Sequence, residues 1–95
     1  MIQILKVIEI AFHGGANPFW AMEYRVRTEQ GTAFLTGTFL VEEIGHRAFI
    51  DSRSMRVMGK VGMHRTHDSL KHARALNGFL VEKRTDIKEL KEKLK

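Results

Sequence analysis

Cysteine is absent from the 95 residues of the chain. This absence excludes disulfide bonds, a thiolate nucleophile and every zinc site that needs a cysteine ligand. Long apolar runs are absent as well, because the N-terminal stretch 2–10 is interrupted by Lys6 and Glu9. We therefore expect no signal peptide, no membrane span and a cytoplasmic location.

Sequence motifs of catalysis are also missing. Ser52, Ser54 and Ser69 lie in no nucleophile-elbow pattern, and the neighbouring Glu42 and Glu43 would point to opposite sides of any strand. The signatures of RNA-recognition sheets, GXXG loops and zinc fingers are absent too. From these absences we predict a non-enzymatic protein that needs no cofactor.

Five histidines raise the question of a metal site. His64, His67 and His72 lie near Asp68, but only Asp68 and His72 have the i, i+4 spacing that shares one helix face. A metal site needs three or four converging ligands, so the pattern favours solvated histidines and no metal.

The chain is basic and has the composition of a globular protein. Its 16 Lys and Arg against 11 Asp and Glu give a formal net charge of +5 and a calculated pI of about 9.9. This balance favours acidic partners, although an ordinary soluble surface gives the same charge. Because 43% of the residues are hydrophobic and the length suits one core, we predict a single domain spanning 1–95.

The stretch Trp20–Val41 predicts a β-hairpin around which the sheet is built. Its even-numbered residues 20–28 are mostly apolar and alternate with polar ones, which indicates a strand with one dry face. A two-residue loop at 30–31 is predicted, because a three-residue loop would bury threonine hydroxyls under aromatic rings. The predicted dry pairs are Thr28/Ala33, Val26/Leu35, Tyr24/Gly37, Met22/Phe39 and Trp20/Val41.

Three further strands are predicted around this hairpin. The stretch 2–12 has an apolar even-numbered face broken only by Lys6, and we place it near the centre of the sheet. A turn is predicted at 42–45, followed by a short strand at 46–51 and another at 55–63.

Two helices are predicted after the strands. The first begins near Asp68, with Thr66 or Asp68 as its N-cap. Its apolar stripe comprises Leu70, Ala73, Leu76 and Leu80, with Lys71, His72 and Arg74 outside it. The sequence leaves open whether this helix ends at Asn77-Gly78, before a short strand at 79–82, or continues through the glycine. Asp86 with Glu89 predicts the cap of a last helix.

These elements predict an α+β fold in a single small domain. An antiparallel sheet of about five strands, open or barrel-like, is followed by one or two C-terminal helices. Residues 1–64 are predicted to be mostly β and residues 66–95 mostly helical. The last helix carries an apolar seam that needs covering, so we predict a homo-oligomer. The seam residues are Ile87, Leu90 and Leu94.

The outer face of the predicted sheet interleaves basic and aromatic side chains. The candidate nucleic-acid-binding residues are Arg25, Arg27, Phe34, Phe49, Arg56 and Lys60. Cations that follow phosphates and rings that stack on bases are the features of proteins that bind single strands. Solvated strand positions partly neutralised by Glu23 and Glu29 give the same pattern.

We therefore predict a small binding module for DNA or RNA, with single strands favoured, and no membrane partner. The alternative hypothesis is a small inhibitor or adaptor of the kind found among phage and plasmid accessory proteins. Such a protein would dock on a larger protein through a sheet edge or a helix.

Overall fold

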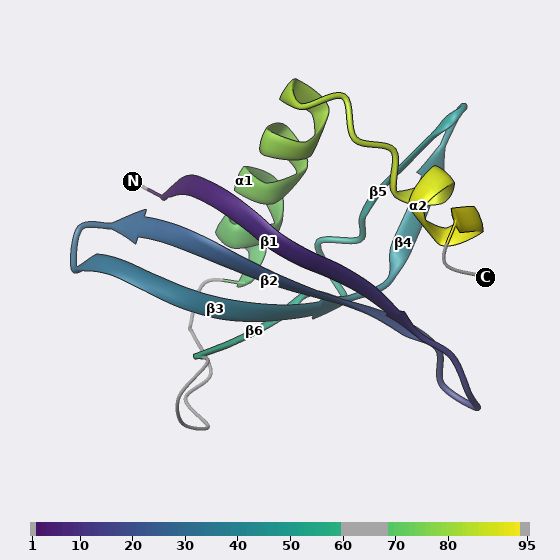
Figure 1. Ribbon diagram of the computed structural model, residues 1–95, viewed down its shortest axis with the longest axis horizontal. Helices are drawn as coiled ribbons and strands as arrows, with labels where there is room; N and C mark the ends of the chain where they lie inside the picture. The colour runs from purple at the N-terminus through teal and green to yellow at the C-terminus, as the bar shows by residue number, and fades with distance from the viewer. Residues whose placement is uncertain (1, 60–68, 94–95) are drawn as a thin grey trace.

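The computed structural model describes residues 2–59 and 69–93, which form a four-stranded sheet, a two-stranded sheet and two helices (Figure 1). The elements are β1 (Gln3–His13), β2 (Phe19–Thr28), β3 (Gly31–Phe39), β4 (Val41–Ile44), β5 (Arg47–Ile50), β6 (Arg56–Gly59), α1 (Ser69–Glu82) and α2 (Ile87–Lys93). The larger sheet is antiparallel in the order β1-β2-β3-β6, and β4 pairs with β5. The predicted α+β class is confirmed. Because β1 and β6 are the edges of the described sheet, it is open rather than barrel-like.

The central hairpin has the predicted faces but a different register. β2 and β3 bury Trp20 and Phe39 on the same side of the sheet, as the alternation predicts. The predicted pairing is wrong by two residues, because Trp20 pairs with Phe39 rather than with Val41. The loop is Glu29-Gln30, and the positive φ of 113° falls on Gly31, which starts β3. This placement of the glycine shifts the register by two and leaves every side chain on its predicted face.

Gly37 lies opposite Met22 rather than opposite the predicted Tyr24. A Cβ atom at this position would overlap the terminal methyl of Met55, which is fully buried. The glycine therefore makes room for the methionine that covers it, and the Tyr24 ring lies beside this contact.

Strand β1 lies at the edge of the sheet, so its predicted central position is wrong. Leu5 and Ile8 are extra residues in its ladder with β2, where the register shifts. Each extra residue reverses the alternation, so Lys6 joins the outer face while Val7 turns to the inner face. The lysine that interrupts the apolar face in the sequence thus marks an irregularity that brings its charge into solvent.

The second sheet is formed partly by residues that the sequence predicts as a turn. The turn predicted at 42–45 is wrong, because these residues mostly belong to β4 and the chain reverses at Gly45-His46. Gly45 provides the positive φ of 63° at this reversal. The strand predicted at 46–51 is confirmed as β5, and β6 confirms the first part of the strand predicted at 55–63. Residues 60–63 lie outside the described part of the chain.

Helix α1 continues through Asn77 and Gly78, which resolves the alternative that the sequence leaves open. The Asn77 side chain does not cap the helix but forms hydrogen bonds to strand β5. Its amide accepts a hydrogen bond from the Ile50 N–H at 2.8 Å and donates one to the Ile50 carbonyl at 3.1 Å. Thr66 and Asp68, the predicted N-caps, lie outside the described residues.

The prediction for the apolar stripe of α1 is wrong at its first residue, Leu70, and for His72. Leu70 is 44% exposed, whereas His72, predicted outside the stripe, is only 4% exposed. The Nδ1 atom of His72 lies 2.7 Å from the Tyr24 hydroxyl, so a polar side chain is accommodated in the core by a hydrogen bond.

Helix α2 begins directly after Asp86, whose carboxylate accepts the Lys88 N–H at 2.9 Å. The Asp86 part of the predicted cap is therefore confirmed. Ile87 is buried, and α2 packs against β5.

The core lies between the inner face of the larger sheet, the small sheet and the two helices (Figure 1). It comprises Trp20, Met22, Tyr24, Val26, Leu35, Phe39, Ala48, Ile50, Met55, Val57, Ala73, Leu76, Leu80 and Ile87. Helix α1 lies over the inner face, and no element among the described residues covers the outer face (Figure 1). The outer face is therefore the larger exposed surface on which to look for a site.

Candidate nucleic-acid interface

The outer face of the four-stranded sheet is organised in rows that cross the strands. One row joins Lys6 of β1, Arg25 of β2 and Phe34 of β3, which are neighbours in the two ladders. All three side chains are exposed. Because neighbouring strands lie about 4.8 Å apart, this row spans roughly 10 Å across the sheet.

The Arg25 guanidinium lies over the Phe34 ring, 5.5 Å from the ring centroid. Phe34 remains 49% exposed, so part of the ring surface is open to solvent. This geometry is a cation–π contact, which restricts both side chains on the surface of the sheet. The pair thus offers a positive charge and an aromatic surface at one position.

The neighbouring row adds another cation. Arg27 lies two residues along β2 from Arg25, between Gln3 of β1 and Thr32 of β3. We call Lys6, Arg25, Arg27 and Phe34 the basic–aromatic cluster. Three cations and one ring gather here on three adjacent strands, with polar neighbours.

An acidic row borders the basic–aromatic cluster on one side. Glu9 of β1 and Glu23 of β2 are paired across the ladder, with Thr36 of β3 beyond Glu23. Two adjacent carboxylates repel anions, so this row is less favourable to an anionic ligand than the end of the sheet near Phe34. The outer face is therefore divided by charge rather than uniformly basic.

Three residues predicted to share this site lie elsewhere or are not described. Arg56 is on the outer face, but it pairs with Thr38, four residues along β3 from Phe34, and its guanidinium donates to the carbonyls of Arg53 and Met55. Phe49 belongs to the small sheet, opposite Glu42. Lys60 lies outside the described residues.

Lys6 is the member of the basic–aromatic cluster that the sequence prediction missed. It interrupts an otherwise apolar face, and such an interruption in a strand can signal a β-bulge. Alternation without a bulge predicts that this side chain shares a face with Ile4 and Ile10, and this prediction is wrong.

The residues predicted to form an oligomer seam are partly used within the single chain. Ile87 is 1% exposed, and Leu90 packs half-buried against the core. Leu94 lies outside the described residues. The oligomer itself stays a prediction, and these side chains contribute to the core of one copy.

Tyr24 and His72 are ionisable side chains that lie in the core and form a hydrogen bond with each other. Burial raises the pKa of the Tyr24 hydroxyl above its ordinary value of 10.0. Its partner His72 is the one histidine of the predicted group that the structure describes. Within residues 2–59 and 69–93, no three His, Asp or Glu side chains converge as metal ligands.

Comparison with models of protein families, with curated protein sequences and with solved structures gives no match for this chain. Neither described helix is both long and apolar enough to cross a lipid bilayer.

Proposed function

We propose that the protein binds single-stranded nucleic acid through the basic–aromatic cluster. The observation that supports this proposal is the Arg25 guanidinium held over the exposed Phe34 ring. In single-strand binders, a base stacks on an aromatic ring while nearby cations neutralise the adjoining phosphates. Arg25, Lys6 and Arg27 are in position to provide those cations.

A single strand suits this surface better than a duplex. The bases of a single strand can turn out and stack on a ring, whereas in a duplex they are already stacked and paired. The cluster also lies on strands rather than on a helix or ribbon that could enter a major groove. The net charge of +5 adds a general attraction for polyanions.

Binding of a fluorescently labelled single strand at low salt tests this proposal. We expect Lys6→Ala, Arg25→Ala and Arg27→Ala each to weaken binding. Arg53→Ala is the matched control, because it removes the same charge as the two arginine variants from a side chain that is 83% exposed and bonded to Asp51. An equal loss in the control and the cluster variants would mean that only net charge matters, and the site would be wrong.

A protein-binding adaptor is the second candidate, and it rests on the small sheet. Leu40 and Ile44 are 49% and 60% exposed, and Phe49 is paired with Glu42 on the same side of the β4–β5 hairpin as Ile44. Exposed apolar side chains on a projecting hairpin suit contact with another protein. A partner captured from a host lysate should then be lost with Ile44→Ser and kept with Val81→Ser, a control on α1 that is 40% exposed.

A further inference from the structure

The guanidinium of Arg56, on strand β6, is oriented by the backbone of its own neighbours in the chain. Its Nη1 atom donates to the Met55 carbonyl at 2.9 Å and to the Arg53 carbonyl at 3.3 Å. A guanidinium has five N–H donors, so the three donors of Nε and Nη2 remain without a partner among the described residues. Nε and Nη2 form the edge that binds two oxygens of a phosphate at once. Arg56 therefore presents an oriented anion-binding edge.

Arg56 is exposed, and the other members of its row on the outer face are small. It pairs with Thr38 of β3, and the row continues with Ala21 of β2 and Ala11 of β1. Arg56 lies four residues along β3 and one strand across from Phe34. This displacement is roughly 13 Å along the strand and about 4.8 Å across it, or about 14 Å in all. One ligand of moderate length can therefore touch both side chains.

Strand β3 joins Phe34 to the row of Arg56 through uncharged side chains. The outward residues of β3 beyond Phe34 are Thr36 and Thr38. Thr36 shares its row with the two carboxylates of the acidic row, but these belong to β1 and β2. On the side of β3 and β6 the same row consists of Thr36 and Met58. A polyanion that follows β3 thus passes over the uncharged half of the row.

We propose that a bound single strand runs along β3 from the basic–aromatic cluster to Arg56. A base stacks on Phe34, and a phosphate further along the strand is held by the free edge of the Arg56 guanidinium. We call Phe34, Thr36, Thr38 and Arg56 the β3 path. This inference rests on the proposed function and defines the length of its ligand. At 3.4 Å per nucleotide of a stacked strand, the span of about 14 Å corresponds to about four nucleotides, and an extended strand covers it with fewer.

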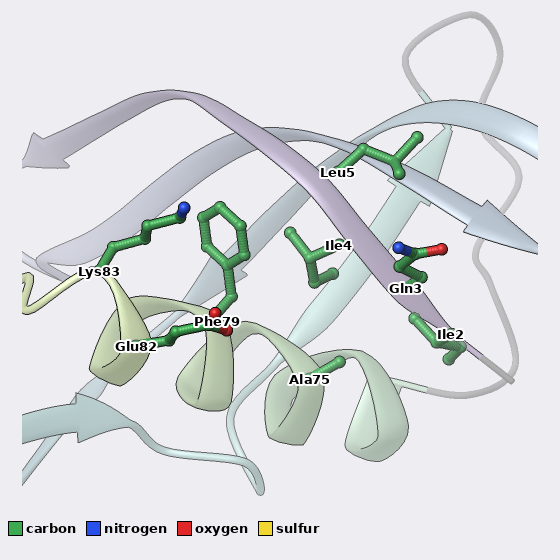
Figure 2. A pocket seen from close by; sticks show the side chains of 8 residues that line it. All are labelled: Ile2, Gln3, Ile4, Leu5, Ala75, Phe79, Glu82 and Lys83. Atoms are coloured by element: carbon green, nitrogen blue, oxygen red, sulfur yellow. The ribbon is translucent and has the colours of Figure 1, made fainter.

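The groove between β1 and α1 is less suited to a polyanion. It has a volume of about 490 Å³, and Figure 2 shows Ile4 and Phe79 pointing toward each other across it. The charged side chains among its described lining residues are Glu82 and Lys83. The Lys83 ammonium lies over the Phe79 ring, 5.6 Å from the ring centroid. A single cation beside a carboxylate attracts a chain of phosphates less than the outer face does.

The salt dependence of binding tests the contact at Arg56. With a labelled oligothymidylate of about ten nucleotides, Arg56→Ala should reduce the log-log salt slope by about 0.7, because one phosphate contact is lost. The same loss weakens binding roughly eightfold at about 50 mM salt. Arg74→Ala is the matched control, because Arg74 is an exposed arginine of α1, which lies over the inner face (Figure 1). It should leave the slope nearly unchanged.

Two substitutions by glutamate test the route of the strand. Thr38→Glu places a carboxylate on the β3 path beside Arg56 and should weaken binding at least as much as Arg56→Ala. Ala11→Glu makes the same charge change in the same row, but on β1. It should weaken binding several-fold less, because β1 lies about 9.6 Å from β3 and salt screens the charge. Both positions are half-buried on the outer face, so the two variants are matched.

The length of the ligand is tested by competition with shorter strands. A competitor of about two nucleotides cannot reach from Phe34 to Arg56, so Arg56→Ala should leave its affinity unchanged. With competitors of about six nucleotides or more, the variant should lose the full factor. Oligo-glutamate of equal length should compete poorly, since it has no base to stack on Phe34. Equal competition would mean that the outer face selects acidic peptides, and it would overturn the inference.

The outcomes separate this inference from the proposed function. Thermal melts show that each variant remains folded. If Arg25→Ala weakens binding but Arg56→Ala behaves as Arg74→Ala does, the proposed function stands and the β3 path is wrong. Equal losses in Thr38→Glu and Ala11→Glu would overturn the path as well. A wild type that binds no single strand at low salt would instead overturn the proposed function, and the path with it.

Discussion

The side chain of Asn77 pairs with the backbone of Ile50 as a strand would, accepting from its N–H and donating to its carbonyl. One amide thereby joins the middle of α1 to β5 and satisfies two backbone groups at once. Helix α1 is held in register with the small sheet by this contact as well as by apolar packing.

Removing this amide should destabilise the protein. We expect Asn77→Ala to lower the free energy of unfolding by about 1–3 kcal/mol, because both backbone groups of Ile50 lose their partner in a part-buried site. Asn17→Ala is the matched control in an exposed loop and should cost less than about 0.5 kcal/mol. Urea unfolding measures both, and equal effects would show that the Asn77 contact contributes nothing.

Truncation of the two phenylalanines of β3 should cost different amounts of stability, since they lie on opposite faces. Phe39 is 1% exposed and stacks beside Trp20, with ring centroids 6.4 Å apart. Phe39→Ala should therefore cost about 3–5 kcal/mol, and Trp20→Ala a similar amount. Phe34→Ala should cost under about 1 kcal/mol, because Phe34 is half exposed. A small loss at Phe39 in urea unfolding would contradict the assignment of the faces.

The single tyrosine gives a pH-dependent test of the core. Burial raises the pKa of Tyr24, so the folded chain holds the phenolic proton at a pH where the unfolded chain has lost it. The contribution of Tyr24 to stability is constant below the ordinary pKa of 10.0 and falls as the pH rises above it.

Absorbance of the tyrosinate ion should thus appear only as the protein unfolds at alkaline pH. Tyr24→Phe lacks this ionisation, so the stability difference between the wild type and the variant should shrink above about pH 10. Free ionisation of Tyr24 near pH 10 in a protein still folded by circular dichroism would show that the hydroxyl is solvated.

The faces of the sheet could be predicted from the sequence, but its register could not. Alternation with a period of two fixes which side Trp20 and Phe39 occupy, and a shift of two residues keeps that answer. The register depends instead on which turn residue has positive φ, and the glycine at 31 can take either place in or after the loop. The register of the hairpin thus follows from the positive φ of Gly31, which the alternation of side chains does not determine.

The candidate site could be predicted only in part for a similar reason. Arg25, Arg27 and Phe34 lie on one regular hairpin, so parity alone brings them together. Lys6 joins them through an irregular ladder that depends on pairing with β2. Phe49 belongs to a second sheet, where the sequence predicts a turn followed by a short strand of the main sheet. Local pattern could not predict where Lys6 and Phe49 lie, because their positions depend on the strands with which they pair.

The side chain of Asn77 illustrates the same limit for the helices. An Asn-Gly pair is a common helix end, so the local pattern leaves open whether the helix stops there or continues. Two hydrogen bonds to Ile50 and the packing of Leu80 in the core keep the helix intact beyond that point. Tertiary contacts thus override a local preference worth about 1 kcal/mol.

The salt dependence of single-strand binding tests the proposed function most directly. On a log-log plot the affinity should fall linearly with salt, with a slope of about 0.7 per phosphate contacted. Arg25→Ala should reduce that slope, whereas Phe34→Ala should weaken binding by about 1–3 kcal/mol with the slope nearly intact, because stacking releases no counterions. Failure to bind DNA or RNA at low salt, or equal slope changes in both variants, would contradict binding through the basic–aromatic cluster.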